Sequence, residues 1–578
     1  MWLRVYLWTV SFPSPYQIKF LSRPVDLHSI DASAAPSSAA RQTPATTSAS
    51  RVRVIITLVI LVLLGFGLRL NGISSVGFAE DEVNKLYAVR AYEHGDISPN
   101  AEHPMLMKSL MYVSMRVAES WDAGGGGGRA WGKISDEAAL RFPNVLFGAL
   151  TVVPLFLLTS ALFDRRTGLL AAALWAFGIN AITYNRIAKE DTLLVFFMLY
   201  GFYFYLHAKQ TSGYDNKSKR RSYIWSGVSW GLMMASKYFP HYFGLNALYH
   251  HLYHPRKPAP DEPHKGVPRI YYIMVAVAFL LANPAVLLPQ TWAYLNAYSS
   301  EQLLTHHGYL MAEHLYKNNP SSTPFWGTPL YFYALFLAIK VPLPVLLAFL
   351  VGLFETVRRW REPGHGFLLL MFLLWIIPYS LFGAKWLRYT LSLMPFVYMI
   401  AAVGIVWLVR WCASLFKSAW AQRIIVALLL LIFIALPAWT AAMSAPHYAA
   451  YTNFLGGGRA GYYFPHDEFY DDGLREAIRF VCQTAPQGGA IAHETPAVVR
   501  YYLEQYGRTD LQSRVLSAAD FKLEDELNKP TYIILQRGRT YFENQEKLAQ
   551  VRATLPKVYE VKVEGASAAE VYATQPNR

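Results

Sequence analysis

The stretch SYIWSGVSWGLMMASKYFPHYFGLNALYHHLYH, residues 222–254, decides how many times this chain crosses a membrane. As one helix it would extend ~50 Å, much more than a hydrocarbon core of ~30 Å requires. The polar pair Ser236–Lys237 interrupts the apolar run near its middle, and Pro240 disfavours a continuous helix there. The stretch is therefore predicted to form two short spans, 222–236 and 239–253, that fold back on each other.

Apolar runs of similar length recur on both sides of this stretch. Hydrophobic residues make up 53% of the 578 residues and charged residues only 16%, whereas soluble chains carry about a quarter charged residues. With the two short spans, these runs predict a polytopic α-helical membrane protein with about eleven transmembrane helices, and they exclude a soluble globular protein. The other nine predicted spans are 53–70, 143–162, 168–185, 191–207, 270–288, 330–353, 366–383, 389–410 and 424–443.

The basic residues predict the orientation of the spans. The net charge is +14, and with the fold-back at 236–240 most of the basic clusters fall on one side of the membrane. The positive-inside rule then places the N-terminus in the cytoplasm and the C-terminal part outside, which in a bacterium is the periplasm. This pattern also argues against nucleic acid as a partner. The clusters are Arg51 and Arg53, Arg165 and Arg166, Lys217 to Arg221, Arg256 to Lys265, Arg358 to Arg361, and Lys417 with Arg423.

The two ends of the chain differ from the apolar middle. Residues 1–52 are predicted to be cytoplasmic and largely disordered, because 31–50 form an Ala/Ser/Thr/Pro tract. In 444–578, helix-like and strand-like stretches alternate, which predicts an external α/β domain with a mostly parallel sheet. Its predicted strands are 490–493, 514–517, 532–536 and 558–563, and its predicted helices are 472–484, 496–506, 518–527 and 545–554.

Charged motifs gather in the segments predicted to lie outside the membrane. Glu80, Asp81 and Glu82 follow the first span, and adjacent carboxylates beside a membrane are costly unless they have a function or water around them. Four other segments share this face: His103 to Lys108 (HPMLMK), Arg186 to Asp191 (RIAKED), Ser236 to Tyr238 (SKY) and Lys385 to Tyr389 (KWLRY).

Each motif also has a purely structural interpretation. The three carboxylates would then form a solvated turn, and Lys385 and Arg388 would extend from span ends toward water. Arg186 and Asp191 would form an ion pair that orients their turn, and His103 would pack within its loop.

Taken in order, the motifs resemble glycosyltransferase family 39, the dolichyl-phosphate-mannose–protein mannosyltransferases, whose relatives include bacterial aminoarabinose transferases acting on lipid A. The resembling elements run from Arg69-Leu70 and Gly72 through Asp81-Glu82, His103 to Lys108, Arg186 with Asp191, and Ser236 to Tyr238, to Lys385–Tyr389. They cover roughly residues 55–455. The sequence departs from the family's His-Pro-Pro at Met105, which bears on the acceptor more than on the donor.

The resemblance implies a GT-C-type fold in which 53–443 form the transmembrane glycosyltransferase domain, with external loops 71–142 and 290–328. It implies transfer of mannose or a related hexose or pentose from a polyprenyl-phosphate carrier to a hydroxyl of a protein or glycolipid, at the external face of a bacterial inner membrane. The family places the general base on Asp81, with Glu82 and Asp191 as further catalytic residues, and a base at the membrane edge is expected to have a raised pKa. Donor-phosphate and substrate-binding roles fall on Arg69, His103, Lys108, Arg186, Lys237, Lys385, Arg388 and Tyr389.

No cofactor is required by this resemblance, although Asp81, Glu82 and Asp191 could hold a divalent ion. His306 and His307 lack the ligand spacing of a metal site. The C-terminal domain is expected to recognise the acceptor or act as a scaffold, without catalytic groups. Two other classes remain alternatives: a transporter or flippase for lipid-linked sugars, for which the halves show no internal repeat, and a non-catalytic sensor, which would leave the acidic motif unexplained.

Overall fold

The computed structural model describes residues 48–128, 132–211, 216–253, 266–300, 307–319 and 325–575. The chain divides into two units, residues 1–57 and residues 58–578. The predicted disorder of the N-terminal segment lies outside the described residues, apart from the first turns of helix α1 (Ser48–Leu70). The second unit contains all the interactions considered below.

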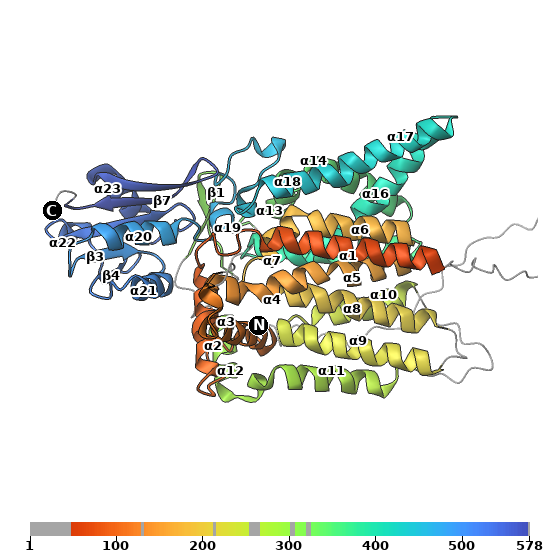
Figure 1. The fold of residues 1–578 in the computed structure, drawn as a ribbon, viewed down its shortest axis with the longest axis horizontal. Coiled ribbons are helices and arrows are strands. Elements are labelled where there is room, and N and C mark those ends of the chain that lie inside the picture. The colour runs from red at the N-terminus through yellow and green to blue at the C-terminus, as the bar shows by residue number, and fades with distance from the viewer. Residues whose placement is uncertain are drawn as a thin grey trace, which may run out of the picture. The chain divides into compact units, whose positions relative to one another are not determined.

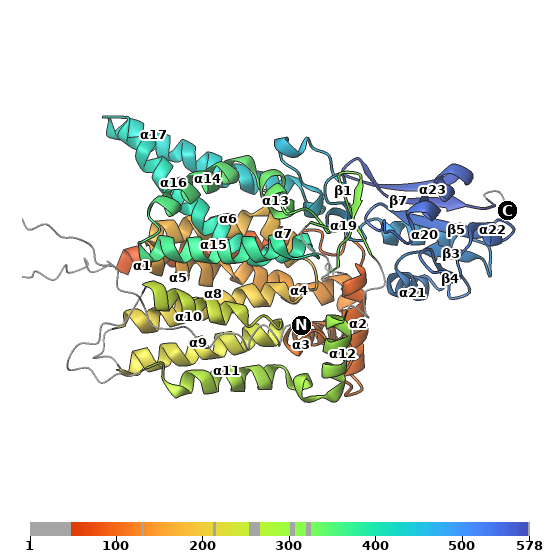
Figure 2. The ribbon, with the colours of Figure 1, turned by 180° about the vertical axis from the view of Figure 1, so that it is seen from behind.

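Helices cover most of every range predicted to span a membrane. Several predicted spans consist of two consecutive helices, and Figures 1 and 2 show the long helices of the second unit lying side by side. They are α4 (Asp136–Leu150) with α5 (Val152–Leu162), α6 (Arg165–Phe177) with α7 (Ile179–Asn185), α8 (Asp191–Gln210), α9 (Asn216–Ser236), α10 (His241–Tyr253), α11 (Arg269–Ala282), α13 (Phe332–Lys340) with α14 (Leu343–Arg358), α15 (Pro363–Leu381), α16 (Met394–Ser414), and α17 (Ala419–Leu430) with α18 (Leu436–Met443).

Six of the described helices are long and apolar enough to cross a membrane, and the bent pair α6–α7 would make a seventh. The six are Arg51–Leu70, Asp136–Leu162, Asp191–Gln210, Pro363–Leu381, Met394–Ser414 and Ala419–Met443. The chain is thus an integral membrane protein, while the number eleven stays a prediction. The remaining predicted spans correspond to α9, α10, α11 and the pair α13–α14. Helix α9 has 21 residues but begins with the basic stretch NKSKRR, whereas the other helices are too short to count as spans by length.

The predicted fold-back between residues 236 and 240 is present. Helix α9 ends at Ser236 and α10 begins at His241. In a straight helix Trp230 and Phe243 would be ~20 Å apart, yet their ring centroids are separated by 6.1 Å. Near the other ends of the two helices, His250 and Tyr223 both contact the Tyr205 ring, at 4.7 Å and 5.5 Å. The two helices are therefore antiparallel.

The loop after α1 contains two helices, α2 (Glu80–Tyr92) and α3 (Met105–Ala123), followed by a short 3-10 turn (Gly126–Gly128). The later loop contains α12 (Pro289–Ser299) and a hairpin of β1 (Tyr309–Met311) and β2 (His314–Tyr316). Short 3-10 turns at Pro284–Leu287, Leu387–Ser392, Tyr448–Ala450 and Phe454–Gly456 connect other elements.

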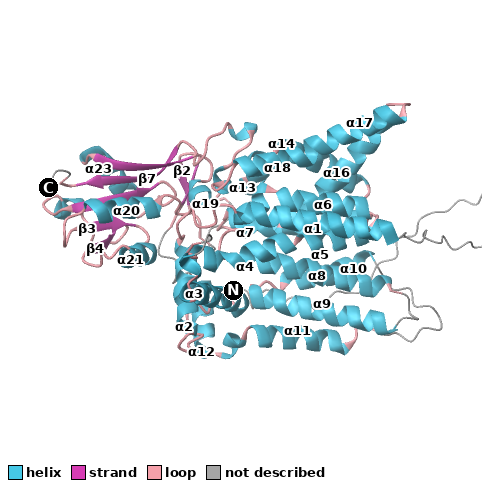
Figure 3. Ribbon diagram, in the orientation of Figure 1, coloured by secondary structure: helices cyan, strands magenta, loops and turns pink. Residues whose placement is uncertain are grey.

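A five-stranded sheet lies in the C-terminal region (Figure 3), with strand order β4-β3-β5-β7-β6. The pairs β3–β4 and β3–β5 are parallel, whereas β5–β7 and β6–β7 are antiparallel. The sheet is therefore mixed, and the prediction of a mostly parallel sheet is wrong. The strands are β3 (Ala490–His493), β4 (Gln512–Val515), β5 (Thr531–Gln536), β6 (Lys557–Val563) and β7 (Ala566–Ala573).

The cause of the error is β7, whose sequence ASAAEVYA is poor in β-branched and aromatic residues. It forms because it pairs with the fully buried central strand β5. The accompanying helices are α19 (Pro465–Phe469), α20 (Leu474–Thr484), α21 (Pro496–Gln505), α22 (Leu523–Glu526) and α23 (Gln545–Thr554). Helix α22 is much shorter than the predicted helix 518–527.

Candidate active site

The acidic motif Glu80-Asp81-Glu82 forms the first turn of α2. Carboxylates are favourable there because the unpaired N–H groups give a helix N-terminus partial positive charge. Glu82 accepts the N–H of Ala79 at 3.0 Å, closing the helix start. The turn thereby points its three side chains in different directions, and each has a different set of partners.

Glu82 is buried and fully bonded. It accepts two hydrogen bonds from Arg141 of α4, at 2.8 and 2.6 Å, and one from the backbone N–H of Ala188 at 2.8 Å. Its side chain is only 1% exposed. Arg141 also donates to the carbonyl oxygens of Ile73, Val76 and Gly77. These bonds fix the start of α2 in place, and the predicted catalytic role of Glu82 stays a prediction.

Asp81 meets three donors on a single carboxylate oxygen. Its Oδ2 forms an ion pair with Lys189, lies 3.5 Å from Arg388 Nη1, and accepts a 2.7 Å hydrogen bond from the Tyr470 hydroxyl. Among the described residues no donor contacts Oδ1, and the side chain is 35% exposed. Oδ2 is thus held by two cations and a hydroxyl group, while Oδ1 belongs to a partly exposed side chain and has no donor among the described residues.

The pKa of Asp81 is opposite to the expectation for a base at a membrane edge. Burial raises this pKa, but the charges of Lys189, Arg388 and Lys85 outweigh burial and hold the pKa well below its usual value. These charges favour the carboxylate anion of Asp81. The direction of the shift is therefore opposite to the predicted raised pKa.

Two further ion pairs lie around Asp81. Lys85 and Glu190 are 3.1 Å apart with both side chains 1% exposed, and Lys237 lies 2.6 Å from Asp191. Lys237 also lies over the Tyr389 ring at 5.0 Å. Asp191, Lys237, Arg388 and Tyr389, which the sequence placed in three separate segments, are thus brought together.

His103 lies near this cluster in its neutral form. Burial lowers its pKa to about 3. The Glu190 charge opposes this shift, while the Lys85 and Lys189 charges act with burial. An uncharged imidazole can donate or accept one hydrogen bond but adds no charge to the site. Its predicted contact with a substrate stays a prediction.

Four of the predicted phosphate-binding cations bond backbone carbonyls. Arg69 is fully buried and bonds Gly65, Trp175 and Ala176 besides the Asn185 side chain, while Lys108 bonds Pro99 and Asn100. Arg186 donates to Arg69, Asn71 and Gly72, and Lys385 to Thr328 and Phe382. In this structure these four cations fix loops and helix ends, and their predicted phosphate- or substrate-binding roles stay predictions. The Arg186–Asp191 ion pair considered as an alternative does not form, because Asp191 bonds Lys237.

The C-terminal region contacts this site directly, through residues that sequence analysis did not single out. The expectation that it carries no catalytic group stays a prediction. Tyr470 and Asp471 have positive φ angles of 46° and 67°, a backbone conformation that costs non-glycine residues energy and is often found at functional sites. Tyr470 reaches Asp81, and Asp471 accepts the Glu80 backbone N–H at 3.0 Å. Arg539 completes the contact, bonding Asp471 and lying 3.0 Å from Glu80.

Sequence reasoning missed Lys85, Lys189 and Tyr470. Lys189 lies inside the RIAKED motif, so the sequence shows its positive charge. The sequence does not show that its side chain points to Asp81. Tyr470 is separated from Asp81 by 389 positions, and no local pattern indicates that contact. The three carboxylates considered as metal ligands each bond a different cation, and no metal-binding group of His, Cys, Asp or Glu occurs among the described residues.

Comparison with protein families supports the resemblance drawn from the motifs. Residues 132–287 match a family model described as dolichyl-phosphate-mannose-protein mannosyltransferase, which confirms the resemblance over less than a third of the chain. No curated protein matches the sequence.

Several solved structures are similar at low sequence identity. ArnT from Cupriavidus metallidurans in the apo state shares 13% identity, with 91% of this chain and 98% of ArnT covered and a TM-score of 0.49. The archaeal oligosaccharyltransferase AglB from Archaeoglobus fulgidus, in complex with an inhibitory peptide and a dolichol-phosphate, shares 12% identity over 91% and 74% of the two chains, with a TM-score of 0.47. The Pmt1-Pmt2 complex of S. cerevisiae shares 16% identity over 45% and 39%, with a TM-score of 0.29.

Replacement of Glu82 by Gln should destabilise the protein. The change leaves the buried Arg141 guanidinium without its anion, which costs about 3–5 kcal/mol. The thermal unfolding midpoint of the purified protein should fall clearly. Glu93→Gln is the matched control, because Glu93 forms a long ion pair of 3.6 Å with Arg116 at the protein surface. Exposed pairs of this kind contribute ~0–1 kcal/mol. Equal midpoints for both variants would contradict the positioning role of Glu82.

Proposed function

We propose that this chain is a membrane glycosyltransferase. It moves a sugar, mannose or a related hexose or pentose, from a polyprenyl-phosphate carrier to a hydroxyl group of a protein or glycolipid. The observation that carries this proposal is the Asp81 carboxylate, which has one oxygen held by cations and the other open. The family match at 132–287 supports the class of reaction.

Asp81 is the proposed general base, acting through Oδ1. The acceptor hydroxyl donates its proton to Oδ1 while its oxygen forms a bond to the anomeric carbon of the sugar. The bond between that carbon and the phosphate oxygen breaks, and its electron pair stays on the phosphate. Because the leaving group is a stable phosphate anion, no separate acid is needed to protonate it.

Arg388 and Lys189 are the proposed phosphate-binding groups, with Lys237 and Tyr389 next to them. During transfer the carrier phosphate gains one negative charge as Asp81 loses one by accepting the proton. The total charge of the site is therefore unchanged, and the cations that stabilised Asp81 can stabilise the phosphate instead. Arg388 suits this task because its planar guanidinium can bond two oxygens at once.

Donor binding would reconcile the low pKa of Asp81 with its proposed role as a base. An incoming phosphate shares the positive charge of Lys189 and Arg388, and it places a like charge near the carboxylate. Both effects raise the pKa of Asp81 toward the range that a base requires, while burial already acts in that direction. The carboxylate would thus become basic only when a donor is present.

The proposed topology has about eleven spans in the inner membrane of a bacterium, with the N-terminus in the cytoplasm. Residues 444–578 would form a periplasmic α/β domain. The positive-inside distribution supports this orientation, and so does the antiparallel pair α9–α10. Lys237 follows α9 and Asp191 begins α8, so their ion pair places these two helix ends beside each other. Lys189, just before α8, forms the ion pair with Asp81.

A transporter for lipid-linked sugars is the weaker alternative. Transport would need the charged cluster to open to both sides, whereas Lys85 and Glu190 are closed off from solvent. The family match also names a transferase. A transferase and a transporter differ in whether a sugar linkage is formed.

Asp81→Asn should reduce sugar transfer by about 10²–10⁴-fold, because the amide cannot accept the hydroxyl proton. The measurement is transfer from radiolabelled polyprenyl-phosphate sugar in membranes, at matched protein levels. Asp96→Asn is the control, since Asp96 lies in the exposed turn after α2. Undiminished transfer by Asp81→Asn would remove Asp81 from the mechanism.

Lys189→Met should move the acid limb of the pH–rate profile upward by ~1–3 pH units. Lys189 lowers the pKa of Asp81, so without it the carboxylate becomes protonated at a higher pH and activity is lost there. The readout is the position of the limb in kcat/KM, not its height, and Lys133→Met at an exposed position is the control. An unshifted limb would show that Asp81 is not the titrating base.

A further inference from the structure

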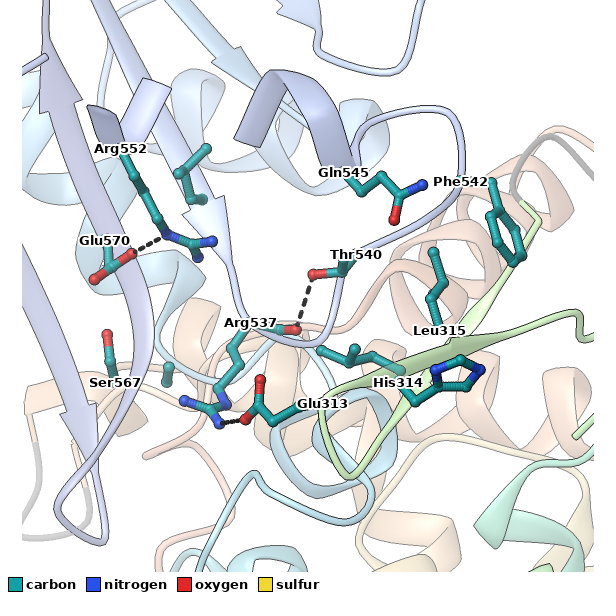
Figure 4. A pocket seen from close by; sticks show the side chains of 13 residues that line it. Glu313, His314, Leu315, Arg537, Thr540, Phe542, Gln545, Arg552, Ser567 and Glu570 are labelled. Atoms are coloured by element: carbon teal, nitrogen blue, oxygen red, sulfur yellow. Dashed lines mark hydrogen bonds and ion pairs between the residues drawn. The ribbon is translucent and has the colours of Figure 1, made fainter. Parts of the chain in front are cut away.

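A cavity of about 650 Å³ lies between the β1–β2 hairpin and the C-terminal sheet. This volume is within the ~300–1,000 Å³ of small-molecule sites. Figure 4 shows side chains from the hairpin, from the segment after β5, and from α23 and β7 facing this space. None of the residues around Asp81 lines it.

Hydrogen bonds and ion pairs join the hairpin to the C-terminal region on both sides of the cavity. On one side the Ala312 backbone donates to the Tyr462 carbonyl at 3.0 Å, and Glu313 forms a 2.9 Å ion pair with Arg537. On the other side His307 forms a 2.7 Å contact with Glu543 and accepts the Phe542 backbone N–H at 3.0 Å. The hairpin is therefore attached to the C-terminal region at both margins of the cavity.

The hairpin turn carries an unusual backbone. Ala312 and Glu313, its two loop residues, both have positive φ angles, 49° and 65°. Such two-residue turns normally contain Asn and Gly, because other side chains are strained there. The turn directs the Glu313 carboxylate to Arg537 at the cavity wall (Figure 4), and strain of this kind is often kept for a function.

The chemistry of the lining fits an uncharged, hydroxyl-rich ligand. Its two arginines, Arg537 and Arg552, are each paired with a carboxylate, Glu313 and Glu570, so the four charges cancel. A free anion would find both arginines neutralised, and an apolar ligand would remove water from the ion pairs without replacing its hydrogen bonds. Sugar hydroxyls can bond both partners of such pairs.

The cavity also offers an aromatic surface. Phe542 lines it with 41% of its surface exposed. A sugar ring has an apolar face of C–H groups that can cover such a ring, while Gln545 and Thr540 supply uncharged hydrogen-bonding groups at the same wall. Charge, hydrogen bonding and apolar surface thus point to one class of ligand.

We propose that this cavity is a binding site for a neutral oligosaccharide, and that it holds the glycan part of the acceptor. The second part rests on the proposed function, because the donor's own sugar must lie at Asp81. The segment from Arg537 to Arg539 connects the two places: Arg537 lines the cavity, and Arg539 bonds the Asp471 carboxylate next to Tyr470. An acceptor held here is therefore attached to the same segment that completes the Asp81 site.

The direct test is saturation-transfer NMR on the full chain in lipid nanodiscs, with mannotriose and maltotriose as probes. Saturable binding of a trisaccharide is expected, weakened about tenfold by Phe542→Ala and reduced by Gln545→Ala, which changes only an exposed side chain. Phe454→Ala, a highly exposed phenylalanine outside the cavity, should bind as the unchanged protein does. The proposal would be overturned if no trisaccharide bound saturably. It would also be overturned if Phe542→Ala and Gln545→Ala both bound the trisaccharide as tightly as the unchanged protein does.

Two further arms identify the source of the sugar. Polyprenyl phosphate should not displace the trisaccharide, and displacement would assign the binding to the donor site instead. In transfer assays the cavity variants should raise the KM for the acceptor with the KM for the donor unchanged, and a changed donor KM would contradict an acceptor site. Because trisaccharide binding needs no transfer, its outcome is independent of the role of Asp81.

Discussion

The buried ion pair between Glu82 and Arg141 is the interaction on which the proposed active site depends. Glu82 joins the start of α2 to the backbone of Ala188, and Arg141 joins α4 to the carbonyls of the segment that leads out of α1. Asp81 and Lys189 are each one residue away from these bonded positions. Their contact follows from this pair, and so does the direction of the open oxygen of Asp81.

A second constraint comes from the C-terminal region, which does more than cover the membrane helices. The buried Arg539–Asp471 pair bonds the N-terminus of α2, and the strained backbone at 470–471 places the Tyr470 hydroxyl on Asp81. Opposite charges and hydrogen bonds to the charged form both stabilise a carboxylate anion. Tyr470, Lys189 and Arg388 supply that support from three distant parts of the chain.

The sequence was sufficient for what local patterns determine. Pro240 and the polar pair before it indicated the fold-back of α9 and α10, and the order of charged motifs indicated that Asp81, Asp191 and Lys237 belong to one site. The ion pair between Asp191 and Lys237 was not predicted, because the sequence favoured Arg186 as the partner of Asp191. The sequence was insufficient where the role of a residue depends on the direction of its side chain or on a contact between distant segments. Arg69 and Lys189 are both cations beside predicted spans, but only Lys189 points to a carboxylate. Strand β7 has a weak local β-propensity and forms through its backbone pairing with β5. No short-range pattern in the sequence connects Tyr470 with Asp81.

The central claim is that the cations around Asp81 hold the phosphate of a lipid-linked sugar. An experimental structure of the protein in nanodiscs with a polyprenyl-phosphate sugar tests it most directly. The account predicts phosphate oxygens within about 3 Å of Arg388 and Lys189, with the anomeric carbon facing Oδ1 of Asp81. Phosphate density at Arg69, Lys108 or Lys385, with Asp81 still bonded to Lys189 and Arg388 as before, would contradict it.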